Sequence, residues 1–233
     1  TDNSRQITSL DVIYYNDSYL TLVGSSDKDA VAGDYGGVYL HDGAKPFAGW
    51  IDLQVGDGAA GTKYDVLAAA FSPDFADDQQ IVALITDDVP GSPTTRVTSM
   101  LVGSDWGTPV SDATLGAFAS SSGCLAFPPP DYESLAAPEY WGYEVTDSKY
   151  LQYIGVSASG YSAVYMVRGV EKPGNSTAVP MSIPSTSKAV HSIAVTGNGI
   201  AIAGLVNGGV LRSGFLLSYT PPSVTATANN TCV

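Results

Sequence analysis

The feature of this sequence that most constrains its fold is a unit of four short strand-like runs that occurs four times. Turn-forming residues separate the runs, and the copies follow one another at a spacing of about 60 residues. Four strands in each period are typical of β-propeller blades. We therefore predict an all-β chain, a β-propeller of four visible four-stranded blades that either closes as a ring or belongs to a larger ring. The blades are expected at about residues 7–60, 64–116, 122–184 and 189–219.

The inner strands of each copy are expected to be buried on both faces. The runs Val66–Ala70 and Ile200–Ala203 are almost continuously apolar and contain small residues, which suits the crowded centre of a propeller. The alanine-rich run 66–71 is the one candidate for a helix, but it stops at Ser72-Pro73, and proline ends a helix. The fourth run alternates, so one of its faces is expected to meet water. The first runs are expected near residues 7–12, 66–71, 124–128 and 190–195.

Part of the repeat is similar to a known family. Residues 66–83 resemble the segment that joins the innermost strand to the second in bacterial extracellular propellers of the BNR/Asp-box group, which is related to sialidases and sortilin. Residues 36–39 and 208–213 resemble the third strand of the same repeats. The resemblance implies a propeller fold. The Asp-boxes are eroded to remnants such as His41-Asp42-Gly43 and Ser104-Asp105-Trp106-Gly107, so it does not imply catalysis.

Charge limits the partners. The chain has 10 Lys and Arg against 23 Asp and Glu, a net charge of −13, so nucleic acid is a poor partner. No apolar run approaches 18 residues, so we expect no direct membrane insertion. A weakly charged polar surface is common outside cells, and we predict a secreted or cell-surface protein. Its partner is expected to be a protein or another copy of the chain, with a glycan as the alternative.

No catalytic or cofactor-binding residues are predicted. His41 and His191 lie in different copies without a serine or cysteine motif, and we read the first as a turn residue and the second as a polar residue at a strand edge. A long loop is the candidate ligand site because aromatic rings stack on sugars, although packing of the rings on a blade is the interpretation we favour. The candidate ligand residues are Tyr132, Tyr140, Trp141 and Tyr143.

The acidic loop after the second run is a candidate Ca²⁺ site. Asp27, Asp29 and Asp34 offer oxygen ligands of the type that calcium prefers. Their spacing matches no known calcium loop, and a solvated acidic loop is the reading we favour. We therefore expect no obligatory cofactor, with Ca²⁺ as the alternative.

Two kinds of covalent modification are suggested by short motifs. Sequons at Asn16, Asn175 and Asn229 are candidate N-glycosylation sites, and all of them fall in expected loops or the tail. Residues 220–233 read as a Thr/Pro-rich tail or linker. Cys124 and Cys232 either form one disulfide or are unrelated residues, and their spacing does not decide between the two.

These observations favour a non-enzymatic extracellular module, such as a cell-surface, envelope-layer or filament component or a binding scaffold. The alternative is a glycan-active hydrolase of the sialidase-like or xyloglucanase-like propeller type. With ten basic residues, an arginine cluster for a sialic acid is hard to assemble. We also expect association through the terminal blades, near Ile7–Val12 and Phe215–Tyr219, because exposed strand edges invite pairing.

Overall fold

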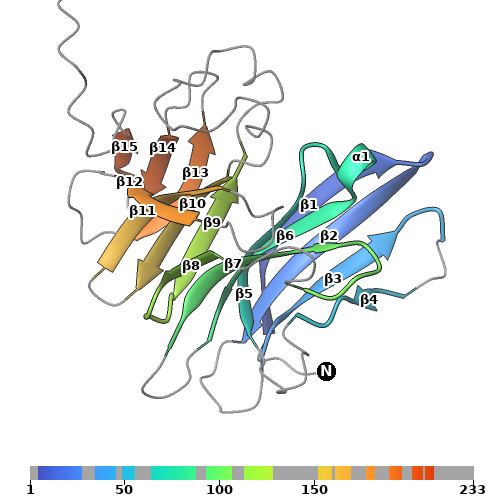
Figure 1. Cartoon of the computed structure of the whole chain (residues 1–233), viewed down its shortest axis with the longest axis horizontal. Coiled ribbons are helices and arrows are strands. Elements are labelled where there is room, and N and C mark those ends of the chain that lie inside the picture. The colour runs from blue at the N-terminus through green and yellow to red at the C-terminus, as the bar shows by residue number, and fades with distance from the viewer. Residues whose placement is uncertain are drawn as a thin grey trace, which may run out of the picture.

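The computed structural model of the chain shows an all-β architecture of four antiparallel sheets (Figure 1). Within each sheet the strands follow one another in chain order, and neighbouring strands are antiparallel. The structure describes residues 5–27, 35–45, 49–55, 64–87, 93–106, 113–127, 152–158, 161–168, 177–181, 189–195, 201–206 and 208–212.

The four sheets are named first to fourth in chain order. The first contains β1 (Arg5–Tyr15), β2 (Ser18–Asp27), β3 (Gly37–Asp42) and β4 (Ile51–Asp52). The second contains β5 (Asp65–Phe71), β6 (Gln80–Thr86), β7 (Thr95–Leu101) and β8 (Ala113–Gly116), with the short helix α1 (Phe75–Asp78) between β5 and β6. The third contains β9 (Ser122–Ala126), β10 (Gln152–Ala158), β11 (Tyr161–Arg168) and β12 (Thr177–Met181). The fourth contains β13 (Val190–Val195), β14 (Ala201–Leu205) and β15 (Val210–Arg212).

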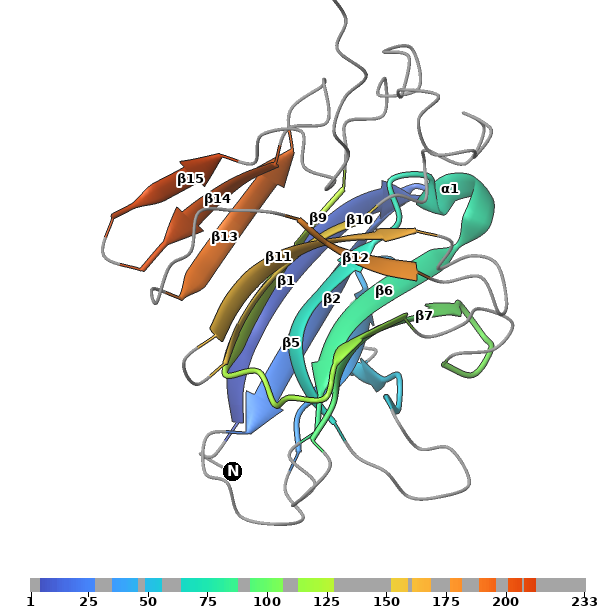
Figure 2. The same ribbon diagram turned by 60° about the vertical axis from the view of Figure 1, so that its left-hand side comes forward.

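The sheets are stacked face to face in the order of the chain. β5 lies against β1, β2 and β3 of the first sheet, β9 lies against β5 and β6, and β13 lies against β9, β10 and β11. The first and fourth sheets lie at opposite ends of the longest axis in Figure 1, and Figure 2 shows the fourth sheet at the edge of the stack. In the part of the chain that the structure describes, the sheets form an open stack rather than a closed ring.

Three apolar layers hold the stack together, one between each pair of neighbouring sheets. Leu22 and Val38 of the first sheet pack with Val66 and Phe71 of the second. Leu84 of the second sheet belongs to the layer shared with the third. Burial of such side chains is the main favourable term in folding, at about 25 cal/mol per Å² of apolar surface. The last layer, between the third and fourth sheets, contains Tyr153, Val164, Met166, Val190, Ala201 and Ala203.

The sheets approach most closely where a small residue faces a large one. A Cβ atom at Gly24 would lie 3.0 Å from Val66 Cγ1 of the next sheet, and one at Gly155 would lie 2.6 Å from Val190 Cγ1. The second and third sheets use the reverse arrangement, because a Cβ at Gly123 of the third would lie 2.3 Å from Leu84 Cδ2 of the second. Every pair of neighbouring sheets thus has one small–large contact near the first strand.

Polar side chains of β1 satisfy the outward backbone groups of β5. The Thr8 hydroxyl donates to the Val66 carbonyl at 2.7 Å. The backbone N–H of Ala69 donates to Ser9 Oγ at 2.8 Å, and that of Phe71 donates to Asp11 Oδ2 at 2.9 Å. Buried backbone groups need such partners, so this row of bonds lets one sheet edge lie inside the stack.

The prediction of four antiparallel sheets in chain order is confirmed for the described residues. The run 66–71 is strand β5, as the Ser72-Pro73 stop indicated. The last predicted run, Phe215–Tyr219, and the tail 220–233 lie outside the described residues. One expectation was wrong: the first strands of the terminal sheets are not buried on both faces, because no sheet covers the outer side of either one within the described stack.

We predict that Gly155→Val destabilises the fold. The new side chain must share space with Val190, which is fully buried, so overpacking should lower the free energy of unfolding by about 1–3 kcal/mol. Urea denaturation followed by circular dichroism measures the change. Gly49→Val is the matched control, because a Cβ there meets no atom within 4 Å. Equal midpoints for the two variants would contradict the close approach of the sheets.

Candidate binding surface

The outer face of the first sheet is apolar and exposed. Alternation along β1 places Leu10, Val12 and Tyr14 on one side, and Tyr19 lies opposite Tyr14 in the β1–β2 pairing. These side chains are half to two-thirds exposed, whereas Leu22, on the face toward the second sheet, is fully buried. We call this surface the first outer face. Its apolar members are Ile7, Leu10, Val12, Tyr14, Tyr19 and Trp50.

Aromatic contacts order this face. The rings of Tyr14 and Tyr19 lie with centroids 5.1 Å apart at an interplanar angle of 59°. Those of His41 and Trp50 lie 5.3 Å apart at 49°. Such tilted contacts between neighbouring strands hold the rings in place while leaving them accessible. The structure also corrects one expectation: His41 lies within β3 rather than in a turn, and the turn begins at Gly43.

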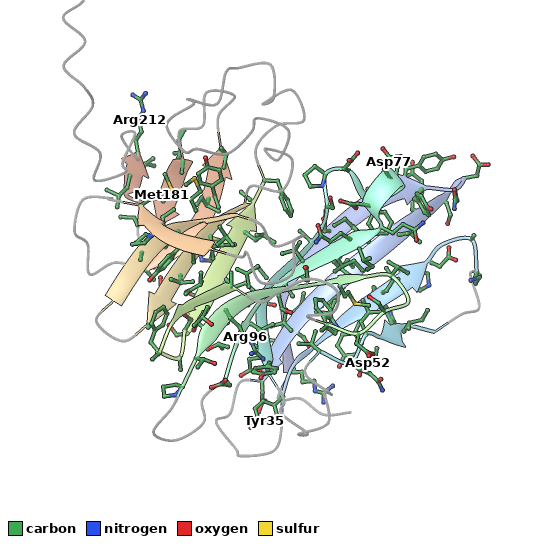
Figure 3. All side chains as sticks on the ribbon, in the orientation of Figure 1. Tyr35, Asp52, Asp77, Arg96, Met181 and Arg212 are labelled. Carbon is green, nitrogen blue, oxygen red and sulfur yellow. The ribbon has the colours of Figure 1, made fainter. Side chains whose placement is uncertain are left out.

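The outer face of the fourth sheet is also uncovered within the described stack, and we call it the fourth outer face. Val210 is 70% exposed, and Ser192, Ala194 and Arg212 are also exposed. Ile202, which pairs with Arg212 across β14 and β15, is half-buried. Figure 3 shows the Arg212 side chain at the end of the molecule opposite Asp52 of the first sheet. The stack therefore ends in two different exposed faces, one at each terminal sheet.

The outer faces were missed by sequence reasoning. The continuously apolar runs at residues 66–70 and 200–203 led us to expect burial on both faces for the inner strands of every copy, including the first. The sequence signal that indicates an exposed apolar face is the polar character of the other side of β1. On that side Thr8, Ser9 and Asp11 form hydrogen bonds to the next sheet. With the polar side of β1 used for internal contacts, its apolar side is left to face outward.

Of the three acidic residues proposed for Ca²⁺, Asp27 lies within the described residues, and the Ca²⁺ site stays a prediction. Asp27 ends β2, and its backbone N–H donates to Asp65 Oδ1 at 2.7 Å. The N–H of Gly36 donates to the same oxygen at 3.0 Å, so Asp65 connects the end of β2 and the start of β3 to the start of β5. No group of three metal-ligating side chains occurs in the part of the chain that the structure describes. Asp29 and Asp34 lie outside that part.

The Asp-box remnants belong to turns. Asp42 Oδ1 accepts hydrogen bonds from the backbone N–H of Ala44 at 3.0 Å and from the Ser18 hydroxyl at 3.1 Å. The bond from Ala44 is the main reason that the pKa of Asp42 lies below its usual value. Ser104 Oγ donates to the Leu101 carbonyl at 2.8 Å and closes the turn after β7. These polar groups thus stabilise turns.

Among the candidate modification sites, Asn16 lies in the tight turn between β1 and β2. It is exposed and has a φ of 48°, a left-handed conformation that Asn adopts readily in such hairpins. The placement leaves its amide accessible, and its glycosylation stays a prediction. The remaining candidates lie outside the described residues: Asn175, Asn229, Tyr132, Tyr140, Trp141, Tyr143 and Cys232.

Cys124 lies in β9, packed beside the layer between the third and fourth sheets. Its thiol lies 3.8 Å from the Gly155 carbonyl, to which it donates a weak hydrogen bond. Burial raises the pKa of the Cys124 thiol to about 12. Because Cys232 is not described, the disulfide between the two stays a prediction.

Comparison of this chain with known proteins gives matches among solved structures. No family model matches the chain, and no curated protein matches it either. Among solved structures, the GH74 xyloglucanase from Xanthomonas campestris is similar at 13% identity and a TM-score of 0.40, over 88% of this chain and 27% of that chain. The chain thus spans about a quarter of the length of that protein. No described helix is long and apolar enough to cross a membrane.

We predict that Cys124 reacts slowly with alkylating reagents in the folded protein. With its pKa raised to about 12, the thiolate fraction at pH 8 is smaller than that of a free cysteine by about three orders of magnitude. A Cys232→Ser variant isolates this thiol, and mass spectrometry follows its labelling by iodoacetamide with and without denaturant. Labelling of the native protein at the denatured rate would contradict the burial of Cys124.

Proposed function

We propose that the chain is a non-enzymatic module of a secreted or cell-surface protein and that it works by binding a protein partner through its terminal outer faces. In this proposal the four sheets are blades of a β-propeller. The low charge density and the three sequons are in keeping with a location outside the cell.

The observation that carries the proposal is the contrast between the two sides of β1. Leu10 is 66% exposed and lies on the side away from the stack, while Thr8 and Ser9 form the inward bonds. Soluble proteins rarely expose contiguous apolar patches of this kind unless the patch meets a partner. The patch includes the exposed aromatic residues Tyr14, Tyr19 and Trp50. Tyr and Trp are among the residue types enriched at protein interaction surfaces.

A structural role also explains the polar residues near the stack. Asp11, Asp65 and Asp42 each accept a hydrogen bond from a backbone N–H, so each of these carboxylates has a structural role. A glycan-active hydrolase, the alternative, requires two carboxyl groups about 5–10 Å apart across a sugar-binding cleft. The non-enzymatic reading therefore accounts for the described carboxylates with fewer assumptions.

We predict that the first outer face contributes little to the stability of the isolated chain. Leu10→Ala should change the free energy of unfolding by about 0.5 kcal/mol or less, because Leu10 is exposed. Leu22→Ala, the matched buried variant in the same sheet, should cost about 2–5 kcal/mol. Urea denaturation at low protein concentration measures both. A large loss for Leu10→Ala would show that the chain itself covers this face, which would rule out its use as a binding surface.

The same preparation tests the enzymatic alternative. Soluble β-glucans and aryl glycosides are incubated with the purified chain, and released reducing ends or aryl groups are measured. We expect no release above a heat-denatured control. Turnover that survives repeated purification would overturn the non-enzymatic proposal.

A further inference from the structure

We propose that the partner of the first outer face is the fourth outer face of a second copy of the chain, so that copies join head to tail. This inference rests on the proposed binding role of the outer faces. The new contact continues the interface that already joins each described sheet to the next.

A shared irregularity aligns the first strands of three sheets. The pairing of β1 with β2 shifts between Ile7 and Ser9, that of β5 with β6 between Val66 and Ala68, and that of β13 with β14 between Val190 and Ser192. Such a β-bulge marks one position in each strand. Ile7, Val66 and Val190 each lie directly before the bulge of their strand. We therefore call them counterparts, and residues at equal distances after the bulge are counterparts in the same sense. Val66 and Val190 are fully buried against the preceding sheet, whereas Ile7 is 73% exposed and has no described sheet before it.

The partners of these residues can be aligned in the same way. Gly24 lies opposite Ser9, and Val66 of the next sheet covers it. Gly204 lies opposite Ser192 at the matching place in the fourth sheet. A Cβ atom at Gly204 would meet only Ser192 within 4 Å, so no residue of a following sheet covers it among the described atoms.

The fourth outer face therefore presents the small residue of a small–large contact, Gly204, and the first outer face presents the large residue, Ile7. Gly155 and Val190 already form this contact between the third and fourth sheets. In the proposed interface, Ile7 of the second copy covers Gly204 as Val66 covers Gly24. The fourth sheet has no described sheet after it and the first has none before it, so the fourth sheet of one copy and the first sheet of the other supply the missing neighbours.

The third strands show the same relation independently. Val38 pairs with Gly24, and Val210 pairs with Gly204, so the two valines are counterparts. Val38 is fully buried by the second sheet, while Val210 is 70% exposed. A sheet packed onto the fourth outer face would bury Val210 as the second sheet buries Val38.

A matching polar contact is also available. Between the first two sheets, the backbone N–H of Ala69 donates to Ser9 Oγ at 2.8 Å. Ser192 is the counterpart of Ser9, and Leu10 is the counterpart of Ala69. We therefore expect the Leu10 N–H of one copy to donate to Ser192 Oγ of the other. A protein sheet supplies this backbone donor at the required position, which favours a second copy over a glycan.

The two faces are different, so the contact is heterologous and joins copies into a ring or a filament. The test uses two single variants and their mixture. Ile7→Asp disables the first outer face, and Val210→Asp disables the fourth. Val102→Asp is the control, because it adds the same charge at an exposed valine in the turn after β7, outside both faces.

Sedimentation velocity of the full chain over a hundredfold range of concentration measures association. We expect wild type and Val102→Asp to form species larger than the 24.1 kDa monomer as concentration rises. Ile7→Asp and Val210→Asp should each remain monomeric, and each should keep the wild-type circular dichroism spectrum. Mixed in equal amounts, they should form a heterodimer and nothing larger, because one intact interface remains between them.

Other outcomes overturn the inference. Monomeric wild type at every concentration excludes head-to-tail joining, and association of either single variant alone shows that like faces pair instead. Monomeric protein that is retained on an insoluble β-glucan through the first outer face identifies a glycan as the partner. None of these results changes the stability contrast between Leu10→Ala and Leu22→Ala, so the two proposals fail separately.

Discussion

The structure depends on how the first strand of each sheet meets the sheet before it. At the best-defined junction, Val66 fills the space left by Gly24, and side chains of β1 satisfy the backbone of β5. The two requirements act together, because a close approach needs a missing Cβ and also removes water from the backbone groups of the approaching strand. A repeat that meets both requirements can be added in series, and each addition buries the exposed face of the sheet before it.

The interior and the ends of the stack then differ for a simple reason. β6 of the second sheet is buried along its whole length because it has a sheet on each side. β1 and β13 have only one described neighbouring sheet each, and along most of each strand exposed residues alternate with half-buried ones. The proposed binding function uses the terminal sheets, because their outer faces have no described neighbour. The contrast between Val66, which is fully buried, and Ile7, which is 73% exposed, expresses this difference most directly.

The fold could be predicted from the sequence to the level of strands and sheets. The continuous apolar run Ile81–Ile85 and the proline after Phe71 are local signals, and local signals determine strand positions. The outer faces could not be predicted in this way, because the alternation of Leu10, Val12 and Tyr14 is the same whether a sheet or solvent lies above them. That distinction depends on which sheets are neighbours, which is a property of the stack. The aromatic loop at Tyr132–Tyr143 lies outside the described residues, and its role stays a prediction.

Hydrogen exchange at the junction between the first two sheets tests this account most directly. The amides of Ala69 and Phe71 donate to Ser9 and Asp11 of β1, so the account predicts that they exchange as slowly as the amides in the middle of β6. It also predicts that Ser9→Ala and Asp11→Ala accelerate exchange at Ala69 and Phe71 respectively. Exchange of both amides in the wild type at the rate of an exposed strand edge would contradict the claim that side chains of one sheet satisfy the backbone groups of the next.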